Sequence, residues 1–264
     1  MDTPFEDIAF LANSANRVAI FETIVEGPKS RAEIRDQVDA SGATITRVLR
    51  GLEERNWITS VGQEFEATPL GEWIYEEFTR LVGELEAERR LREPMQWLPS
   101  EQITFDAQHL RDAEILLVEE TDVTGFFRRV REFQSSGDNI RGVTRGVSPD
   151  MVENQWELTV HGDAHVDFVI SPAVLDVVLE HSIASRQFSE MLDQPNVRFT
   201  VCEEIPMSVA IVDGKVGINL TDEKGVLKGG LICENDVVRE WAIDLFEGCR
   251  ENGTTVDRSM LRRE

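Results

Sequence analysis

The residues with the clearest chemical pattern lie in the run SGATITRVLR, which spans residues 41–50. Ala43, Thr46, Arg47 and Arg50 fall on one side of a helix with 3.6 residues per turn. A small residue and a hydroxyl, followed by arginines, suit a helix that enters the major groove of a duplex, because arginine donates hydrogen bonds to guanine edges and to phosphates. This pattern favours noncovalent recognition of double-stranded DNA.

Two short helices must position this face. Ser30 and Glu33 can form a capping box, which predicts a helix that ends near Val38. Ser41 can cap the second helix after the polar break DASG. The side of the second helix away from Arg47 is one apolar stripe at helical spacing, formed by Ile45, Val48, Leu49 and Leu52.

A hairpin is predicted after the helices, with strands near residues 57–61 and 65–68 and a turn at Gly62-Gln63. This arrangement resembles the winged helix-turn-helix of archaeal and bacterial transcription regulators, over residues 5–68 and above all in SGATITRVLRGLEERNWI. The alternative is a protein–protein module, because winged helices also serve in general transcription machinery. The residues expected to contact DNA are Lys29, Ser30, Arg31, Ser41, Ala43, Thr44, Thr46, Arg47, Arg50 and Gln63.

The net charge of −23 argues against simple attraction to DNA. Only four of the 27 basic residues are lysine, and this acidic, lysine-poor composition resembles that of proteins from salt-in halophiles, above all haloarchaea. Residues 1–93 alone carry a net charge of −8, so an acidic interaction module of the transcription machinery without sequence-specific DNA binding is the second hypothesis. Two points favour DNA: molar salt screens repulsion beyond about 3 Å, and the basic residues Lys29, Arg31, Arg35, Arg47 and Arg50 cluster around the two helices.

The length of 264 residues allows two domains, each with its own core. No apolar run reaches the roughly 18 residues of a membrane span, and MDTPFED is not a secretory signal. We therefore expect a cytoplasmic protein with no membrane partner.

The first helix is expected to begin at Thr3-Pro4 and to continue to Gly27-Pro28. A later helix should open at Thr68-Pro69 and close before Pro94, and its apolar residues Ile74, Phe78, Leu81 and Leu85 form a seam two heptads long. This seam indicates a homodimer contact, or packing of the helix on its own domain. The expected segments are a DNA-binding domain at 1–68, a linker and dimerisation helix at 69–93, a linker at 94–104, an effector-binding domain at 105–250 and a flexible tail at 251–264.

Strands and helices alternate from residue 113 onward, which predicts a mostly parallel sheet with antiparallel strands at its edge. The fold class expected for the whole chain is therefore α+β with two domains, the second an α/β sensor domain with a mixed sheet. The pattern ISPAVLDVVLE, followed by MSVAIVDGKVGINLTDEKGVLKGGLIC, resembles the C-terminal domain of archaeal regulators of the methanogenesis-regulatory-protein type and, more distantly, of TrmB-like regulators. The resemblance covers roughly residues 105–250 and implies a phospholipase D-like fold.

Catalysis is not expected from this domain. Phospholipase D-like enzymes use an H-x-K-x4-D motif, and none of the histidines His109, His161, His165 and His181 has lysine two residues later. His161 and His165 lack an obvious third metal ligand, and the three cysteines lack C-x-x-C spacing. We expect no enzyme activity, no metal and no cofactor.

A binding site for a small anionic metabolite is more plausible than a catalytic site, because ligands of open α/β sheets lie at the carboxyl ends of strands. Thr144, Arg145 and Ser148 follow one expected strand and Ser171 follows another. Arginine can grip a carboxylate or phosphate with two hydrogen bonds. The alternative is that Arg145 pairs with one of the many surface acids.

Overall fold

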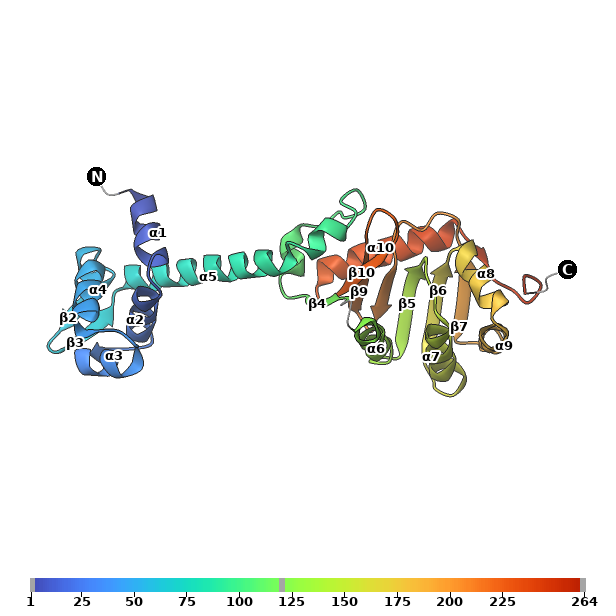
Figure 1. Cartoon of the computed structure of the whole chain (residues 1–264), viewed down its shortest axis with the longest axis horizontal. Helices are drawn as coiled ribbons and strands as arrows, with labels where there is room; N and C mark the ends of the chain where they lie inside the picture. Colours follow the sequence, from blue (N-terminus) through green and yellow to red (C-terminus); the bar gives the residue numbers. More distant parts are fainter. Residues whose placement is uncertain (1–2, 119–121, 262–264) are drawn as a thin grey trace. The chain divides into compact units, whose positions relative to one another are not determined.

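The computed structural model describes residues 3–118 and 122–261, and the chain divides between Glu86 and Ala87 into two compact units. The described residues form an α+β fold with ten α-helices and one large mixed sheet (Figure 1). Helix α5 (Pro69–Leu91) runs across the division between the units.

The N-terminal unit is a set of helices with a small antiparallel sheet whose strand order is β1-β3-β2. Its centre is Phe21, whose ring stacks on Trp57 at 5.9 Å and meets Tyr75 edge-on at 5.5 Å. Tyr75 belongs to α5, so the first turns of α5 complete this core. The elements before α5 are α1 (Pro4–Ala12), α2 (Ala15–Val25), β1 (Lys29–Ser30), α3 (Arg31–Gln37), α4 (Gly42–Glu54), β2 (Ile58–Val61) and β3 (Glu64–Ala67).

The prediction of one long first helix was wrong. The chain breaks at Asn13 and Ser14, and α1 and α2 are bent by 95°. The Ser14 hydroxyl accepts a hydrogen bond from the backbone N–H of Arg17 at 3.3 Å, so serine starts a second helix inside the apolar pattern. No single described helix is long and apolar enough to cross a membrane; α1 and α2 reach the required length and composition only as this bent pair, and Ile20 and Phe21 of α2 lie in the core.

The second unit is built on an eight-stranded sheet with the order β11-β7-β6-β5-β8-β9-β10-β4. Its strands are β4 (Glu114–Leu117), β5 (Asn139–Thr144), β6 (His165–Ile170), β7 (Val197–Val201), β8 (Val209–Val212), β9 (Lys215–Thr221), β10 (Leu227–Cys233) and β11 (Thr254–Thr255). Its helices are α6 (Val123–Gln134), α7 (Pro149–Val160), α8 (Pro172–Glu180), α9 (Ser182–Met191) and α10 (Asp236–Glu251).

The sheet is less parallel than the alternation of elements predicts. Only the β5–β6 and β6–β7 pairs are parallel, and the other pairs are antiparallel. β4 pairs antiparallel with β10 at the edge of the sheet and is only partly covered. Asp213 and Gly214 both have positive φ and join β8 to β9 in a two-residue turn, so an antiparallel hairpin lies inside the sheet.

Two hydrophobic clusters cover the two faces of this sheet. On one face α10 places Val238, Trp241 and Phe246 against the strands. On the other face, α6, α7 and α9 cover Ile140, Phe168 and their neighbours (Figure 1). Side chains alternate between the two faces along each strand.

Two segments expected to be loose are packed instead. The expected linker 94–104 contains a 3₁₀ turn (Pro94–Trp97) whose Pro94 is buried, and the Trp241 indole donates to the Gln102 carbonyl at 2.8 Å. The expected flexible tail 251–264 supplies β11 and the buried side chain of Val256. Residues 262–264 of that tail lie outside the described part of the chain.

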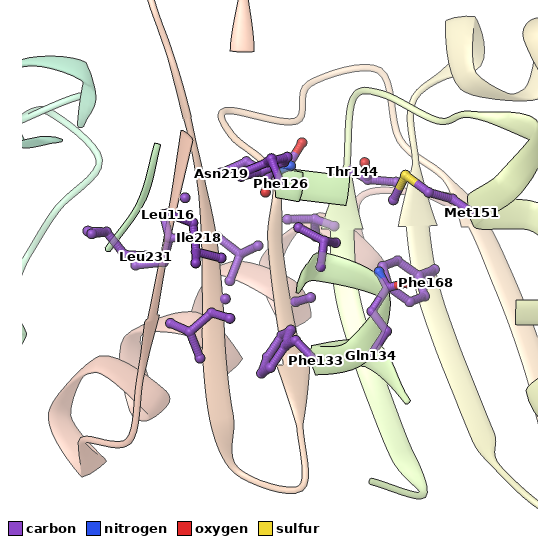
Figure 2. A pocket seen from close by; sticks show the side chains of 18 residues that line it. Leu116, Phe126, Phe133, Gln134, Thr144, Met151, Phe168, Ile218, Asn219 and Leu231 are labelled. Atoms are coloured by element: carbon purple, nitrogen blue, oxygen red, sulfur yellow. The ribbon is translucent and has the colours of Figure 1, made fainter. Parts of the chain in front are cut away.

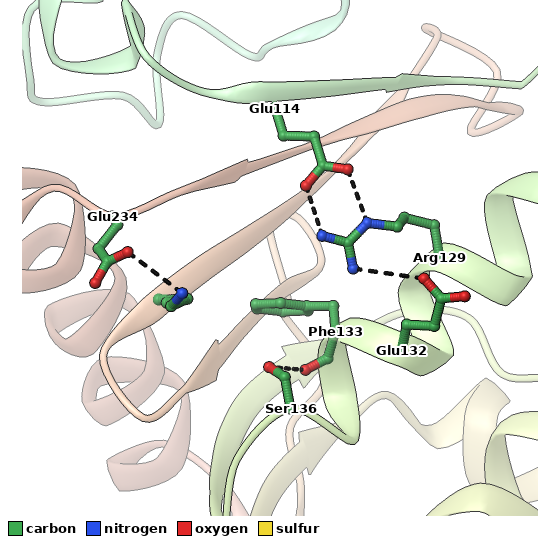
Figure 3. A network of polar contacts seen from close by, with 7 residues as sticks. Glu114, Arg129, Glu132, Phe133, Ser136 and Glu234 are labelled. Atoms are coloured by element: carbon green, nitrogen blue, oxygen red, sulfur yellow. Dashed lines mark hydrogen bonds and ion pairs between the residues drawn. The ribbon is translucent and has the colours of Figure 1, made fainter.

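Helix α6 is tied to the edge strand β4 by one fork of hydrogen bonds. The Arg129 Nε and Nη2 atoms lie 2.7 and 2.6 Å from the two carboxylate oxygens of Glu114 (Figure 3). This bidentate contact lowers the pKa of the Glu114 carboxyl. The contact therefore fixes α6 against β4, the strand that precedes it in the chain.

Candidate nucleic-acid interface

Serine caps fix the starts of the two helices that carry most of the residues expected to contact DNA. The Ser30 hydroxyl accepts from the Glu33 backbone N–H at 3.4 Å, and the Glu33 carboxylate accepts from the Ser30 N–H at 2.8 Å. The Ser30 hydroxyl also donates to the Glu33 carboxylate at 2.7 Å, and this bond, followed by the one from the Ser30 backbone N–H, lowers the pKa of the Glu33 carboxyl. The Ser41 hydroxyl accepts from the Thr44 N–H at 3.2 Å. Ser30 and Ser41 therefore position the helices as well as offering hydroxyls at their ends.

Helix α4 has one buried and one exposed side. Ile45, Val48, Leu49 and Leu52 lie in the core of the N-terminal unit. The four side chains assigned to the DNA-facing side, Ala43, Thr46, Arg47 and Arg50, are all exposed. Within the N-terminal unit this side of α4 is therefore accessible to solvent.

Arg31 and Thr46 are brought into direct contact although 15 residues separate them in sequence. The Arg31 Nη1 atom donates to the Thr46 Oγ1 atom at 2.9 Å, and the Thr46 hydroxyl donates to the Gly42 carbonyl at 2.9 Å. The Arg31 guanidinium also lies 5.3 Å from the centre of the Phe65 ring in β3. These contacts hold the cation of α3 against the exposed side of α4.

The remaining expected contact residues occupy three kinds of position. Lys29 lies in β1 opposite Phe65 and is half-buried. Thr44 is half-buried, with its hydroxyl 2.9 Å from that of Ser41. Gln63 is exposed in the turn between β2 and β3, directly after Gly62, whose φ of 66° favours glycine.

Arg50 is engaged by a neighbouring carboxylate. Its Nε atom lies 2.8 Å from the Glu54 Oε1 atom, and the two side chains are 80% and 57% exposed. An ion pair this exposed contributes at most about 1 kcal/mol, so a phosphate can replace Glu54 as the partner of Arg50. Arg47 forms no ion pair with any described residue.

Arg17 is a basic residue of this surface that the sequence pattern did not single out. Its pKa is lowered by burial first, and then by the charges of Arg47 and Arg55, so it lies close to the basic side of α4. The guanidinium carbons of Arg17 and Arg55 each lie 3.9 Å from the centre of the Phe10 ring. The sequence feature that could have indicated Arg17 is Ser14, because a cap at that position starts α2 and places Arg17 in its first turn.

A second candidate site surrounds the end of β5 in the other unit. Thr144 is the last residue of β5, the backbone N–H of Arg145 donates to the Ser208 hydroxyl at 3.0 Å, and Ser148 caps α7. Ser171 caps α8, and its backbone N–H donates to the Thr144 carbonyl at 3.2 Å, so it lies beside the end of β5. Arg145 and Ser148 share one hollow, which neither Thr144 nor Ser171 lines.

The hollow next to these residues has a volume of about 480 Å³ and lies between α6 and the start of α7. Arg145, Ser148, Ser208 and Asn219 line it together with the apolar side chains Phe126, Phe127, Val130, Val147, Met151 and Leu227. A smaller hollow adjoins it between α6 and the sheet, where Gln134, Thr144 and Met151 lie at one side and Phe126 and Phe133 at the other (Figure 2). The volume of the larger hollow lies in the range typical of small-molecule sites.

Two buried amides that the sequence pattern did not indicate, Asn154 and Gln155, line two neighbouring hollows that share Met151 with the larger one. Gln155 is 8% exposed, its Nε2 atom donates to the Gln134 Oε1 atom at 3.2 Å, and its Oε1 atom has no hydrogen-bond partner among the described residues. Asn154 is 3% exposed, and its Nδ2 atom is likewise unpartnered there. Unsatisfied buried amides cost free energy, so these groups are candidates for ligand or water contacts. No sequence motif marks them.

No metal-binding cluster of three or more His, Cys, Asp or Glu occurs in residues 3–118 and 122–261. Cys202, Cys233 and Cys249 are buried and free. Burial raises the pKa of the Cys233 and Cys249 thiols to about 11 each, which leaves them protonated and unreactive at neutral pH.

Two family models match the chain. Residues 5–90 match the model described as the HVO_A0261 N-terminal domain, and residues 123–252 match the model for the middle domain of the methanogenesis regulatory protein FilR1. A comparison with curated proteins found no match.

Several solved structures are similar at low sequence identity. TrmBL2, an archaeal chromatin protein, is 12% identical with a TM-score of 0.43, and the match covers 96% of this chain and 100% of that one. Nuc of Salmonella typhimurium, a phospholipase D family member, is 13% identical with a TM-score of 0.42 over 55% of this chain and 97% of that one. NucT from Helicobacter pylori is 8% identical with a TM-score of 0.43 over 55% and 99%. Likeness at this level does not carry function from those proteins to this chain. The two family models, in contrast, match two separate stretches, so residues 5–90 are similar to the HVO_A0261 N-terminal domain and residues 123–252 to the FilR1 middle domain.

Proposed function

We propose that this protein is a transcription regulator whose N-terminal unit is a winged helix-turn-helix that binds double-stranded DNA. The observation that carries the proposal is the exposed side of α4, where Thr46, Arg47 and Arg50 stand opposite a fully buried apolar stripe. In this proposal α4 is the recognition helix, α3 crosses the phosphate backbone, and the β2–β3 hairpin is the wing. The name of the family that matches the second unit, a methanogenesis regulatory protein, supports a regulatory role.

Binding of a regulator to DNA is tested most directly by selection from a randomised duplex pool in molar KCl. The full chain is incubated with the pool, bound duplexes are amplified, and the affinity of the enriched duplex is compared with that of a scrambled duplex by fluorescence anisotropy. Enrichment of one sequence, bound at least tenfold more tightly than its scramble, supports the proposal; specific protein–DNA complexes typically exceed this ratio by a wide margin. Equal affinity for both duplexes would count against a sequence-specific regulator.

The acidic charge of the chain favours one competing function, an interaction module that contacts transcription machinery instead of DNA. Residues 1–93 carry a net charge of −8, and an acidic surface repels a duplex unless molar salt screens the repulsion. The same selection separates the two functions, because an interaction module enriches no duplex at any salt concentration.

We also propose that the regulator is a homodimer and that its second unit binds a small anionic effector. The effector would lie in the hollow between α6 and α7, with its anionic group on Arg145, which forms no ion pair within the described ranges, and its apolar part on Phe127 and Met151. A screen of small carboxylates and phosphate esters by thermal unfolding tests this, with Arg145→Gln as the matched variant. A compound that stabilises the parent chain but not the variant supports the site; equal stabilisation of both would place the ligand elsewhere.

A further inference from the structure

The opposite end of the same parallel strands carries a second, basic hollow. β5, β6 and β7 begin there, and the register of the sheet places Arg141 beside Asp167 and Asp167 beside Arg198 in one row across the three strands. Two residues earlier along the strands, Asn139 lies beside His165. The sheet itself therefore fixes the spacing of the two arginines, about two strand widths of 4.7–4.9 Å each.

These side chains point to the face of the sheet that α10 covers. Their neighbours Ile140, Val166 and Phe199 belong to the hydrophobic cluster of the other face, and side chains alternate along a strand. The last turn of α10 brings a third arginine to the row, because the Arg250 Nη1 atom lies 3.4 Å from the Asp167 Oδ2 atom.

The row lines a hollow of about 350 Å³. The charged side chains of its lining are Arg141, Arg198, Arg250 and Asp167, together with His165. Three guanidinium groups face one carboxylate in this lining, whereas the whole chain has a net charge of −23. A locally positive hollow in such a chain attracts anions of a size that fits it.

Two of these arginines are not used by the fold. Arg141 and Arg198 are exposed, and neither forms an ion pair with a residue of the described ranges, although acidic residues outnumber basic ones by 50 to 27. Arg250, in contrast, is held by Asp167 and by Glu247. The charge of Arg250 also offsets the negative end of the α10 dipole, which would otherwise oppose an anion here.

We propose that this hollow binds a phosphate group, with Arg141 and Arg198 as its direct ligands and Arg250 held in place by Asp167. A guanidinium presents two parallel N–H donors that match the oxygens of a phosphate, and two such groups converging from different strands suit a multiply charged oxyanion better than a single carboxylate. The proposal is independent of the effector site, which lies at the other end of β5.

The test uses the full chain in molar KCl and a buffer free of phosphate, with pyrophosphate as the probe and nitrate as the control anion. Binding is measured by isothermal titration calorimetry and by the shift of the thermal unfolding midpoint. The variants are Arg141→Gln, Arg198→Gln and the double variant, and Arg186→Gln is the matched control because Arg186 is a highly exposed arginine of α9 in the same unit. Removal of each charge-assisted contact should weaken pyrophosphate binding roughly tenfold, whereas Arg186→Gln should bind like the parent chain.

Two further titrations identify the source of the phosphate group. A nucleoside monophosphate tests a small phosphate ester, and a scrambled duplex tests the phosphates of a nucleic acid backbone. Weaker binding of any one of these ligands to the double variant, with unchanged binding to Arg186→Gln, supports the site and identifies the kind of molecule that carries the phosphate group. The proposal is overturned if the parent chain binds none of the phosphates more tightly than nitrate, or if the double variant binds them all as the parent does. Unchanged circular dichroism of the variants establishes that the weaker binding is not caused by unfolding.

Discussion

The guanidinium of Arg31 at the start of α3 donates to the hydroxyl of Thr46 in α4, with 2.9 Å between the Nη1 and Oγ1 atoms. The same hydroxyl donates to the Gly42 carbonyl one turn earlier in α4. Thr46 thus serves as acceptor for one helix and donor within the other. The geometry of the exposed side of α4 therefore depends on a side-chain contact between α3 and α4 as well as on the buried apolar stripe of α4.

Replacing Thr46 with valine removes this acceptor while keeping the shape of the side chain. Arg31 then loses its anchor on α4, and we expect DNA affinity to fall several-fold while stability falls by about 1 kcal/mol or less, because the contact is exposed. Fluorescence anisotropy with the selected duplex and chemical denaturation measure the two effects. Thr46→Ser keeps the hydroxyl and should behave like the parent chain; equal decreases in both variants would mean that the methyl group matters and the hydrogen bond does not.

The parts of the fold that follow local rules could be predicted from the sequence. Ser30, Ser41 and the stripe around Leu49 indicate α3 and α4 because capping and helical periodicity involve residues within one or two turns. Alternation of strands and helices likewise indicates the helices that cover the large sheet. These signals depend on neighbours in the sequence, so tertiary contacts do not override them.

The parts that depend on distant contacts could not be predicted. Nothing in the sequence near β4 indicates that Gly229 and Gly230 of β10 pair with it at the edge of the sheet. Helical spacing makes the α5 seam one surface, but Ile74 and Phe78 pack on the N-terminal core while Leu81 and Leu85 stay exposed. Such spacing alone does not tell which partners a seam has. The Arg141–Asp167–Arg198 row exists only through the register of three strands.

Two glycines of α5 should respond in opposite directions to replacement by alanine. A Cβ atom at Gly71 would lie 1.9 Å from the Trp57 carbonyl oxygen, so Gly71→Ala should force α5 away from the N-terminal core and cost about 1–3 kcal/mol or somewhat more. A Cβ atom at Gly83 has no neighbour within 4 Å, and Gly83→Ala should stabilise the helix by up to about 1 kcal/mol. Urea denaturation of both variants measures the difference. The close packing of α5 on Trp57 would be wrong if Gly71→Ala proved as stable as the parent chain.

The exposed end of the α5 seam should carry the homodimer contact. Leu81 and Leu85 are 47% and 52% exposed and lie one turn apart on the same side of α5. Replacing both with glutamate adds like charges at a symmetric contact, which should shift the protein from dimer to monomer in analytical ultracentrifugation. Ile183 of α9 is 67% exposed, so Ile183→Glu is a control that should leave the mass unchanged. A parent chain that sediments as a monomer, or a double variant that remains a dimer, would rule out this homodimer contact.

Acid should loosen α6 through Glu114. The Arg129 fork lowers the pKa of the Glu114 carboxyl in the folded protein, so its contribution to stability is complete above the ordinary pKa of glutamate, near 4.3, and is lost as the pH falls through the lowered value. Both side chains are more than a third exposed, so we expect a contribution of no more than about 1 kcal/mol. Denaturation of the parent chain and of Glu114→Gln between neutral and acidic pH measures it. The two curves should converge in acid; a constant gap between them would show that protonation of Glu114 is not involved.

Removing Arg47 or Arg50 should weaken DNA binding by eliminating phosphate or base interactions while the fold stays intact, because both side chains are exposed. Eliminating one phosphate interaction should reduce the slope of log affinity against log salt concentration by about 0.9, whereas eliminating a base interaction should cost about 1–3 kcal/mol on the selected duplex and little on its scramble. Comparing both duplexes across a KCl series therefore assigns each arginine to one of the two roles.

The variant Glu54→Gln complements Arg50→Ala. It frees Arg50 and removes a negative charge that would face the duplex, so it should strengthen binding. Arg80, exposed on α5 and paired with Glu77, supplies the control Arg80→Ala, which should bind as the parent does. If Arg47→Ala and Arg50→Ala both keep the affinity and the salt slope of the parent chain, α4 does not enter the groove, and the acidic interaction module becomes the better account of this surface.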